Sequence, residues 1–143
     1  MSTPRRAIKD LLVIGGASLD TLHFSGQTSF AAGGAGMYTA AAAQRDGATV
    51  TMFAPRPEPV PGPLQPMLSR VDWIGPTITP AQLPHFEIAH HGGGKATLLD
   101  ALWGAESCLA PHDLPDDLSR YRLVHIAALR SASRQLEFLV ACR

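Results

Sequence analysis

One carboxylate and one pair of glycines in the first third of the chain combine residue types that can bind a small molecule. Asp20 follows an apolar run that ends in Gly15-Gly16, and Gly33-Gly34 precede an alanine-rich segment. A carboxylate accepts hydrogen bonds from two hydroxyl groups at once, and such charge-assisted bonds are the stronger ones. Glycines at the start of a helix leave backbone N–H donors open to a ligand. Together these residues predict a site for a small polyhydroxylated ligand.

The elements that would position these residues follow from the hydrophobic pattern. Residues 8–14 contain a short apolar run, Leu11 to Ile14, closed by glycine, which is typical of a strand buried on both faces of a parallel sheet. Residues 35–46 are rich in alanine and predict a helix, and Gly47 fits the position that ends it. Residues 48–54 predict the next strand. Strand, helix and strand in this order indicate a right-handed crossover and a parallel sheet. Asp20 would then lie beyond the carboxyl end of a strand, where ligands of open α/β sheets bind.

The remaining elements are shorter. Residues 21–30 predict two short strands interrupted at Ser25-Gly26, and residues 55–66 are irregular because they hold six prolines in twelve positions. Further along we expect a short helix at 64–71, a strand at 71–74 and a buried strand at 122–127. Residues 86–91 and 95–99 predict a hairpin around Gly92–Gly94. The last predicted helix is capped by Ser131 or Ser133 and carries Leu136, Leu139 and Val140 on one face.

Composition limits the classes of protein to consider. The 143 residues fit one domain, 45% of them are hydrophobic, and the formal net charge is zero. This balance argues against nucleic acid and against an anionic membrane as partners. No apolar run reaches the roughly 18 residues of a membrane span, so we expect a cytoplasmic protein. Cys108 and Cys142 are expected to be reduced and mostly buried.

The order of these motifs resembles the ribokinase-like (PfkB) carbohydrate kinase family. The resemblance rests on the strand that leads to Gly15-Gly-Ala-Ser-Leu-Asp20 and on Gly33-Gly-Ala-Gly36 at the start of the alanine-rich helix. It implies a three-layer α/β/α sandwich, Rossmann-like, with a small β lid. It also implies transfer of the γ-phosphoryl group of ATP, with Mg²⁺, to a hydroxyl group of a sugar or nucleoside, and the family makes a homodimer through the lid a further expectation.

The resemblance assigns roles to four positions. Asp20 would accept hydrogen bonds from substrate hydroxyl groups, Gly33 and Gly34 would place backbone N–H groups against the substrate, and Ser18 matches a position where a polar side chain often helps to bind the sugar. Tyr38, on the first turn of the predicted helix, could stack on a sugar or base. No residue is predicted to be catalytic.

Other polar motifs favour structural roles. His90 and His91 are neighbours on a predicted strand and would point to opposite faces, so no metal site is predicted, and His125 is expected to be a core residue. Gly92-Gly-Gly-Lys95 lacks the spacing of a phosphate-binding loop and is expected to be a hairpin turn.

Three departures from the family pattern leave the substrate open. Ala35 stands where many sugar kinases carry lysine, and Tyr38 stands where ribokinases favour asparagine. The family's Gly-x-Asp-x-x-Gly pattern is replaced by the proline-rich segment that begins at Pro55.

The resemblance covers nearly the whole chain but only the N-terminal half of a typical family member. The family's catalytic aspartate lies in a C-terminal Gly-Ala-Gly-Asp motif that this sequence lacks. We therefore expect residues 1–143 to be a single, truncated substrate-binding part that is inactive alone. One alternative is a non-catalytic sugar-binding or regulatory module. Another is an ordinary nucleotide-binding α/β domain, although Gly15-Gly-Ala-Ser supplies no phosphate loop.

Overall fold

The computed structural model describes residues 7–143, and its centre is a sheet of four parallel strands. The strands are β1 (Lys9–Ile14), β4 (Val50–Phe53), β6 (Asp72–Ile74) and β10 (Tyr121–Ile126), in the order β10-β1-β4-β6. The strand β1 pairs in parallel with both β10 and β4. The predicted parallel sheet is therefore present, and β1 lies inside it.

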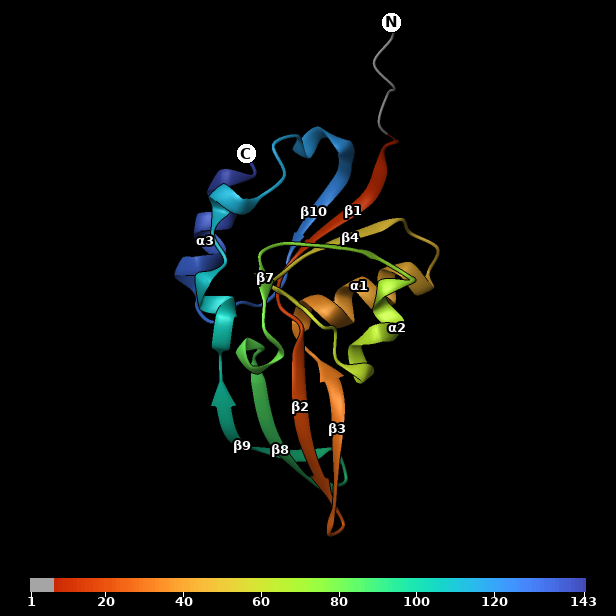
Figure 1. The fold of residues 1–143 in the computed structure, drawn as a ribbon, viewed down its shortest axis with the longest axis vertical. Coiled ribbons are helices and arrows are strands. Elements are labelled where there is room, and N and C mark those ends of the chain that lie inside the picture. Colours follow the sequence, from red (N-terminus) through yellow and green to blue (C-terminus); the bar gives the residue numbers. More distant parts are fainter. Residues whose placement is uncertain (1–6) are drawn as a thin grey trace, which may run out of the picture.

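A second sheet extends from one end of the first (Figure 1). It contains β2 (Ser18–Phe24), β3 (Gln27–Gly33), β8 (His85–Gly92) and β9 (Lys95–Leu102), in the order β3-β2-β8-β9. We call it the lid sheet. Its outer pairs are antiparallel, whereas β2 and β8 run parallel. Two short strands, β5 (Arg56–Pro57) and β7 (Thr77–Ile78), pair separately.

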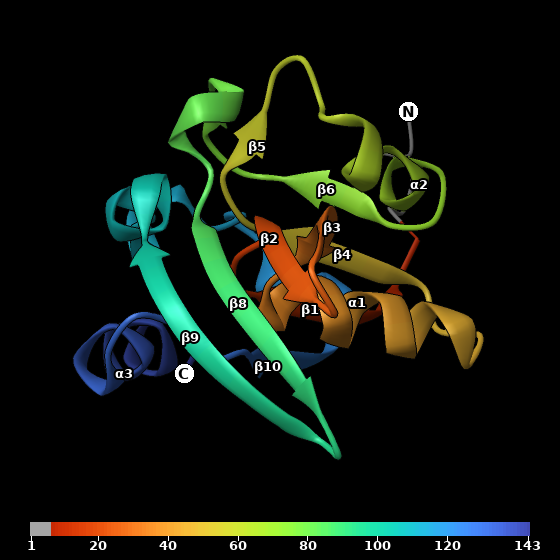
Figure 2. The same cartoon turned by 90° about the horizontal axis from the view of Figure 1, so that it is seen from below.

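Helices cover both faces of the central sheet, as Figure 2 shows from below. Helices α1 (Ala35–Arg45) and α2 (Gln65–Leu68) pack on one face, where β1 contributes Leu11 and Val13. Helix α3 (Ala132–Ala141) packs on the other face, where β1 contributes Leu12 and Ile14. The predicted three-layer α/β/α arrangement with a β lid is confirmed. Short 3₁₀ helices occupy 62–64, 80–82, 104–108, 111–113 and 118–120.

Glycine positions end these elements as the sequence predicts. Ser25 and Gly26 both have positive φ, 50° and 75°, and join β2 to β3 in a tight turn. Gly47 has φ 94° and its N–H donates to the carbonyl of Gln44, 3.0 Å away, directly after α1. These are backbone conformations that residues with a Cβ rarely adopt.

The strand near the carboxyl end of the chain is less buried than its sequence suggests. We expected β10 to be buried and His125 to be a core residue, but His125 and Leu123 are exposed. The reason is topological. Among the described residues β10 is an edge strand with β1 as its one neighbour, and its face toward the α1 side is uncovered.

Helix α3 also turns a different face to the core. Ser131 caps it as predicted, with its hydroxyl accepting the N–H of Arg134 at 3.4 Å. Phe138 is the buried residue, and its ring meets that of Phe53 edge to face at 6.2 Å. The predicted apolar stripe of Leu136, Leu139 and Val140 is exposed instead.

The cysteine prediction is wrong in part, because Cys108 is exposed and Cys142 is half-buried. Both are free thiols, and burial raises the pKa of Cys142. None of the helices within residues 7–143 has the length and apolar character that crossing a bilayer requires.

Candidate functional site

The hairpin of β2 and β3 brings the predicted acid and the predicted glycine together. Ser18 lies directly opposite Gly33 in this pairing, and Asp20 lies two residues further along the same face of β2. A Cβ added to Gly33 would collide with Oδ2 of Asp20 and would lie 2.7 Å from Oγ of Ser18. The carboxylate, the hydroxyl group and the bare backbone therefore meet at one point.

The carboxylate of Asp20 accepts one hydrogen bond from the protein and can accept more. Asp20 is 7% exposed, and its Oδ1 accepts the backbone N–H of Phe86 on β8 at 3.3 Å. A carboxylate has about four acceptor positions, so Oδ2, which faces Gly33, keeps capacity for a further donor. This arrangement suits a carboxylate that accepts hydrogen bonds from ligand hydroxyl groups.

The hydroxyl of Ser18 is buried and has no hydrogen-bond partner among residues 7–143. A buried hydroxyl group without a partner costs about 1–3 kcal/mol. Such groups are rare in folded proteins, and a bound ligand is one physical reason to retain them. Beside Gly33, both the Ser18 hydroxyl and the Asp20 carboxylate can therefore form further hydrogen bonds.

Helix α1 begins immediately beside these groups. Its N-cap is Gly34 with φ 101°, and a Cβ there would lie 2.9 Å from Cα of Ala17. The carbonyl of Gly16 accepts the N–H of Met37 at 3.3 Å. Since both the positive φ and the close approach exclude a side chain at Gly34, the start of α1 is fixed against the loop that follows β1.

Tyr38 lies on the first turn of α1 and is exposed. Its hydroxyl group donates to the carbonyl of Ala32 on β3, 3.4 Å away, next to Gly33. The ring therefore bridges α1 and β3 at the rim of the site.

The structure adds a second buried acid that the sequence analysis missed. Glu106 is 8% exposed, and its Oε1 accepts the N–H of Arg130 at 3.0 Å. A Cβ on Gly16 would lie 2.5 Å from its Oε2, so the carboxyl group packs under the loop that supports Gly34. Burial raises the pKa of Glu106, opposed in part by the Arg130 hydrogen bond and the charge of Arg134.

No sequence signal marks Glu106, because it lies in a short 3₁₀ helix with no hydrophobic period. It lines a cavity of about 350 Å³ next to the N-terminus of α3.

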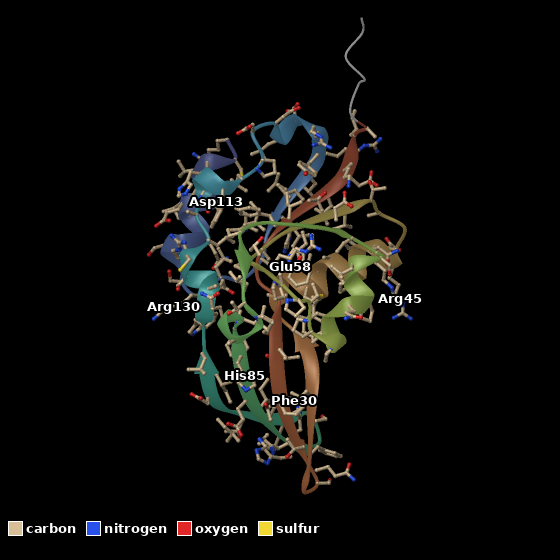
Figure 3. All side chains as sticks on the ribbon, viewed as in Figure 1. Phe30, Arg45, Glu58, His85, Asp113 and Arg130 are labelled. Atoms are coloured by element: carbon tan, nitrogen blue, oxygen red, sulfur yellow. The ribbon has the colours of Figure 1, made fainter. Side chains whose placement is uncertain are left out.

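The lid sheet is anchored where it meets this site. Nδ1 of His85 lies 2.5 Å from the carbonyl oxygen of Leu19. Because a carbonyl oxygen can only accept a hydrogen bond, Nδ1 is the donor. Nε2 of the same ring lies 3.1 Å from Oγ1 of Thr21. His85 is labelled on the lid strands in Figure 3. The ring of Phe86 packs edge to face on Trp103 at 5.2 Å. These contacts fix β8, whose backbone holds Asp20.

The histidines further out on the lid sheet are separate from the site. Nε2 of His91 lies 2.8 Å from Oγ1 of Thr97 across the hairpin. Within residues 7–143, no three or more His, Cys, Asp and Glu side chains come close enough to hold a metal ion.

Comparison by sequence gives no match, either to a family model or to a curated protein. Comparison by structure gives many. A probable sugar kinase from Rhizobium etli CFN 42 superposes with a TM-score of 0.74 over 95% of this chain and 52% of its own, at 14% identity. A ribokinase from Giardia lamblia gives 0.69 over 94% of this chain and 46% of its own, at 18% identity.

An adenosine kinase from Sinorhizobium meliloti gives a TM-score of 0.69 over 84% of this chain and 47% of its own, at 18% identity. This chain therefore spans about half the length of the solved structures it matches. The elements that superpose include the central sheet and lid sheet described above, since nearly the whole chain is covered. The chain has the fold of the ribokinase-like sugar and nucleoside kinases over about half of that fold's length.

Proposed function

We propose that this chain is the N-terminal, substrate-binding part of an ATP-dependent carbohydrate or nucleoside kinase. The observation that carries the proposal is the meeting of the Asp20 carboxylate, the unpartnered Ser18 hydroxyl and the Gly33 backbone beside the start of α1. The similar structures support it, because those named above are a ribokinase, an adenosine kinase and a probable sugar kinase.

The substrate would bind through its hydroxyl groups. Asp20 accepts from one or two of them, Ser18 gains the partner it lacks, and the missing side chains of Gly33 and Gly34 let the substrate approach the backbone closely. Tyr38 at the rim offers an aromatic face to a sugar ring or base. Burial of the bound hydroxyl groups under the lid sheet would strengthen each of these hydrogen bonds.

Phosphoryl transfer needs more than substrate binding. ATP is the second substrate of such a kinase, and Mg²⁺ accompanies it; we assign no described residue to either. A general base contributes typically 10²- to 10⁴-fold to a rate, and a donor to the developing charge contributes about 10²- to 10³-fold. We propose that the 143-residue chain binds substrate without phosphorylating it.

Isothermal titration calorimetry of the whole chain with a panel of ribose, fructose and adenosine tests the binding site. Asp20→Asn keeps the size of the side chain and an acceptor for the Phe86 N–H but removes the charge. We expect it to weaken binding about 10- to 100-fold, which corresponds to the roughly 1.5–3 kcal/mol of a hydrogen bond to a charged group.

The matched control is Asp100→Asn, which removes an exposed carboxylate on β9 of the same lid sheet. It should leave the affinity unchanged. The proposal fails if no member of the panel binds, or if the two variants lose affinity equally.

An ATP-consumption assay with the same panel tests the second part of the proposal. We expect no consumption above that of a substrate-free sample. Turnover by the wild-type chain that Asp20→Asn abolishes would show that the chain is a complete catalyst, and the proposal of inactivity would be wrong.

A further inference from the structure

A second cavity lies away from the Asp20 site and is lined by cationic side chains. Its volume is about 390 Å³, within the usual range of small-molecule sites, and Lys9, Arg56 and Arg120 all line it. None of its lining residues belongs to the Asp20 group. Lys9 opens β1 and Arg120 precedes β10, whereas Asp20 lies beyond the carboxyl end of β1.

Figure 3 helps to locate this cavity. It labels Glu58, the carboxylate that pairs with Arg56, near the middle of the molecule, above Phe30 and His85 on the lid sheet.

The charges around this cavity do not balance. Lys9 forms an ion pair with Asp72, which also lines the cavity, and Arg56 lies 3.3 Å from a carboxylate oxygen of Glu58. Arg120 has no ion-pair partner among residues 7–143. Three cations therefore face two carboxylates, and one of the three has no anion beside it.

Two guanidinium donors at this cavity also lack acceptors. The Nε atoms of Arg56 and Arg120 are both buried, and neither has a hydrogen-bond partner within the described part of the chain. Buried donors of charged groups are normally paired, since leaving one unpaired costs free energy. An anion in the cavity would offer a hydrogen-bond acceptor to the guanidinium groups of both arginines, which line it.

The environment of Lys9 agrees with this surplus of positive charge. The pKa of Lys9 is lowered, first by burial and then by the charge of Arg120. A bound anion would offset both effects by stabilising the ammonium group.

We propose that this cavity binds a small phosphorylated anion, with Arg120, Arg56 and Lys9 as its ligands. The planar guanidinium group matches the spacing of phosphate oxygens and binds them through two parallel hydrogen bonds. Ile74 and Tyr121, which both pack against the core on the α3 side, provide an apolar wall to the same cavity, which suits an organic group attached to the phosphate. The residues involved are independent of those that bind the kinase substrate.

Nuclear magnetic resonance of the wild-type chain gives the most direct test. The ¹⁵N-labelled chain is titrated with inorganic phosphate at pH 7 and constant ionic strength, with sodium chloride as the reference, and the Nε–H signals of the arginines are followed. We expect saturable shifts at Arg120 and Arg56 with phosphate and none with chloride. Phenyl phosphate should saturate at a lower concentration than inorganic phosphate, because its ring contacts the apolar wall.

Two variants make the test specific. Arg120→Gln should weaken phosphate binding at least 10-fold. Arg122→Gln is the matched control, because Arg122 is two residues away, 74% exposed at its side chain and outside the cavity. If Arg120→Gln does not fold, the wild-type titration still decides the outcome.

The proposal is overturned if phosphate gives no saturable shift at Arg120, or if Arg122→Gln weakens binding as much as Arg120→Gln. Equal affinity for phosphate and phenyl phosphate would show that the cavity binds only the phosphate group, and the proposed contact with an attached organic group would be wrong. Asp20→Asn should leave phosphate binding unchanged, so failure at one site is distinguishable from failure at the other.

Discussion

Two acidic residues near the candidate site differ in their hydrogen-bond partners and in the effect of burial on them. Asp20 and Glu106 are both buried carboxyl groups near the loop after β1, but their surroundings differ. Asp20 accepts one backbone N–H and faces the bare backbone of Gly33. Glu106 packs under Gly16, where burial raises its pKa. We infer that Asp20 contacts the ligand and that Glu106 supports the loop from below.

The raised pKa of Glu106 predicts a pH-dependent effect on stability. Because the folded chain binds the Glu106 proton more tightly than the unfolded chain does, the ionised carboxylate lowers the free energy of unfolding once the pH rises above its ordinary pKa of 4.5. Glu106→Gln keeps an acceptor for the Arg130 N–H and cannot ionise. We expect the variant to be more stable than the wild type at pH 7.

Urea unfolding at several pH values measures this difference. The stability gain of Glu106→Gln should shrink as the pH falls and vanish below about pH 4, where both side chains are neutral. A difference that stays constant between pH 4 and pH 8 would contradict the assignment of burial as the cause.

Among the elements, the first turn of α1 packs directly against the backbone of the loop that follows β1. A Cβ on Gly36 would lie 2.6 Å from the backbone carbonyl carbon of Gly15, and both partners are backbone atoms that cannot rotate away. Helix and loop therefore touch without side chains between them. This contact places the N–H groups at the start of α1 at the carboxyl end of β1.

Gly36→Ala tests this contact. Alanine is the better helix former by about 1 kcal/mol, so an exposed position would gain stability. We expect the collision with Gly15 to prevail and to lower the free energy of unfolding by about 1–3 kcal/mol. Gly62→Ala is the control, because no atom lies within 4 Å of its added Cβ, and it should change stability by less than about 1 kcal/mol. Equal stability of both variants in urea unfolding would refute the close contact.

For the whole molecule, both faces of the lid sheet carry exposed apolar side chains, and the face opposite Asp20 includes Phe30 and Leu102. Phe24 and Leu98 lie on the same face as Asp20 and are 55% and 59% exposed. The opposite face carries a polar network in which Nε2 of His23 lies 2.6 Å from a carboxylate oxygen of Glu87. Exposed apolar patches mark interaction surfaces, and we propose that the Phe24 face joins two copies of the chain.

Sedimentation equilibrium over a range of concentrations tests this dimer. We expect a reversible monomer–dimer equilibrium that Phe24→Glu shifts to monomer, because the dimer would bury an unpaired charge. Phe30→Glu is the matched control, since Phe30 is 67% exposed but lies on the opposite face of the lid sheet. A monomer at every concentration, or dissociation by both variants alike, would exclude the proposed interface.

Much of the fold was predictable because its signals are local. Adjacent residues alone indicate the glycine-bounded apolar run at 11–14, the alanine-rich helix after Gly34 and the glycine turn between β8 and β9. The prediction for His125 failed because burial depends on which strands lie beside β10, and no residue within that strand encodes its neighbours. The exposed face of α3 was misassigned for the same reason.

The sequence by itself predicted the main strands and helices in their order and singled out Asp20, Gly33 and Gly34, because residue type and short spacing set turns, helix starts and buried strands. It did not predict the short strands β5 and β7. Only the tertiary structure decided that the Ser18 hydroxyl has no partner, that Glu106 lies beneath the loop at Gly16, and that Lys9 and Arg120 surround one cavity. These residues are far apart in the sequence; Lys9 and Arg120, for example, are separated by 111 positions. Their proximity follows from strand pairing and packing over the whole sheet, which depend on many weak contacts at once.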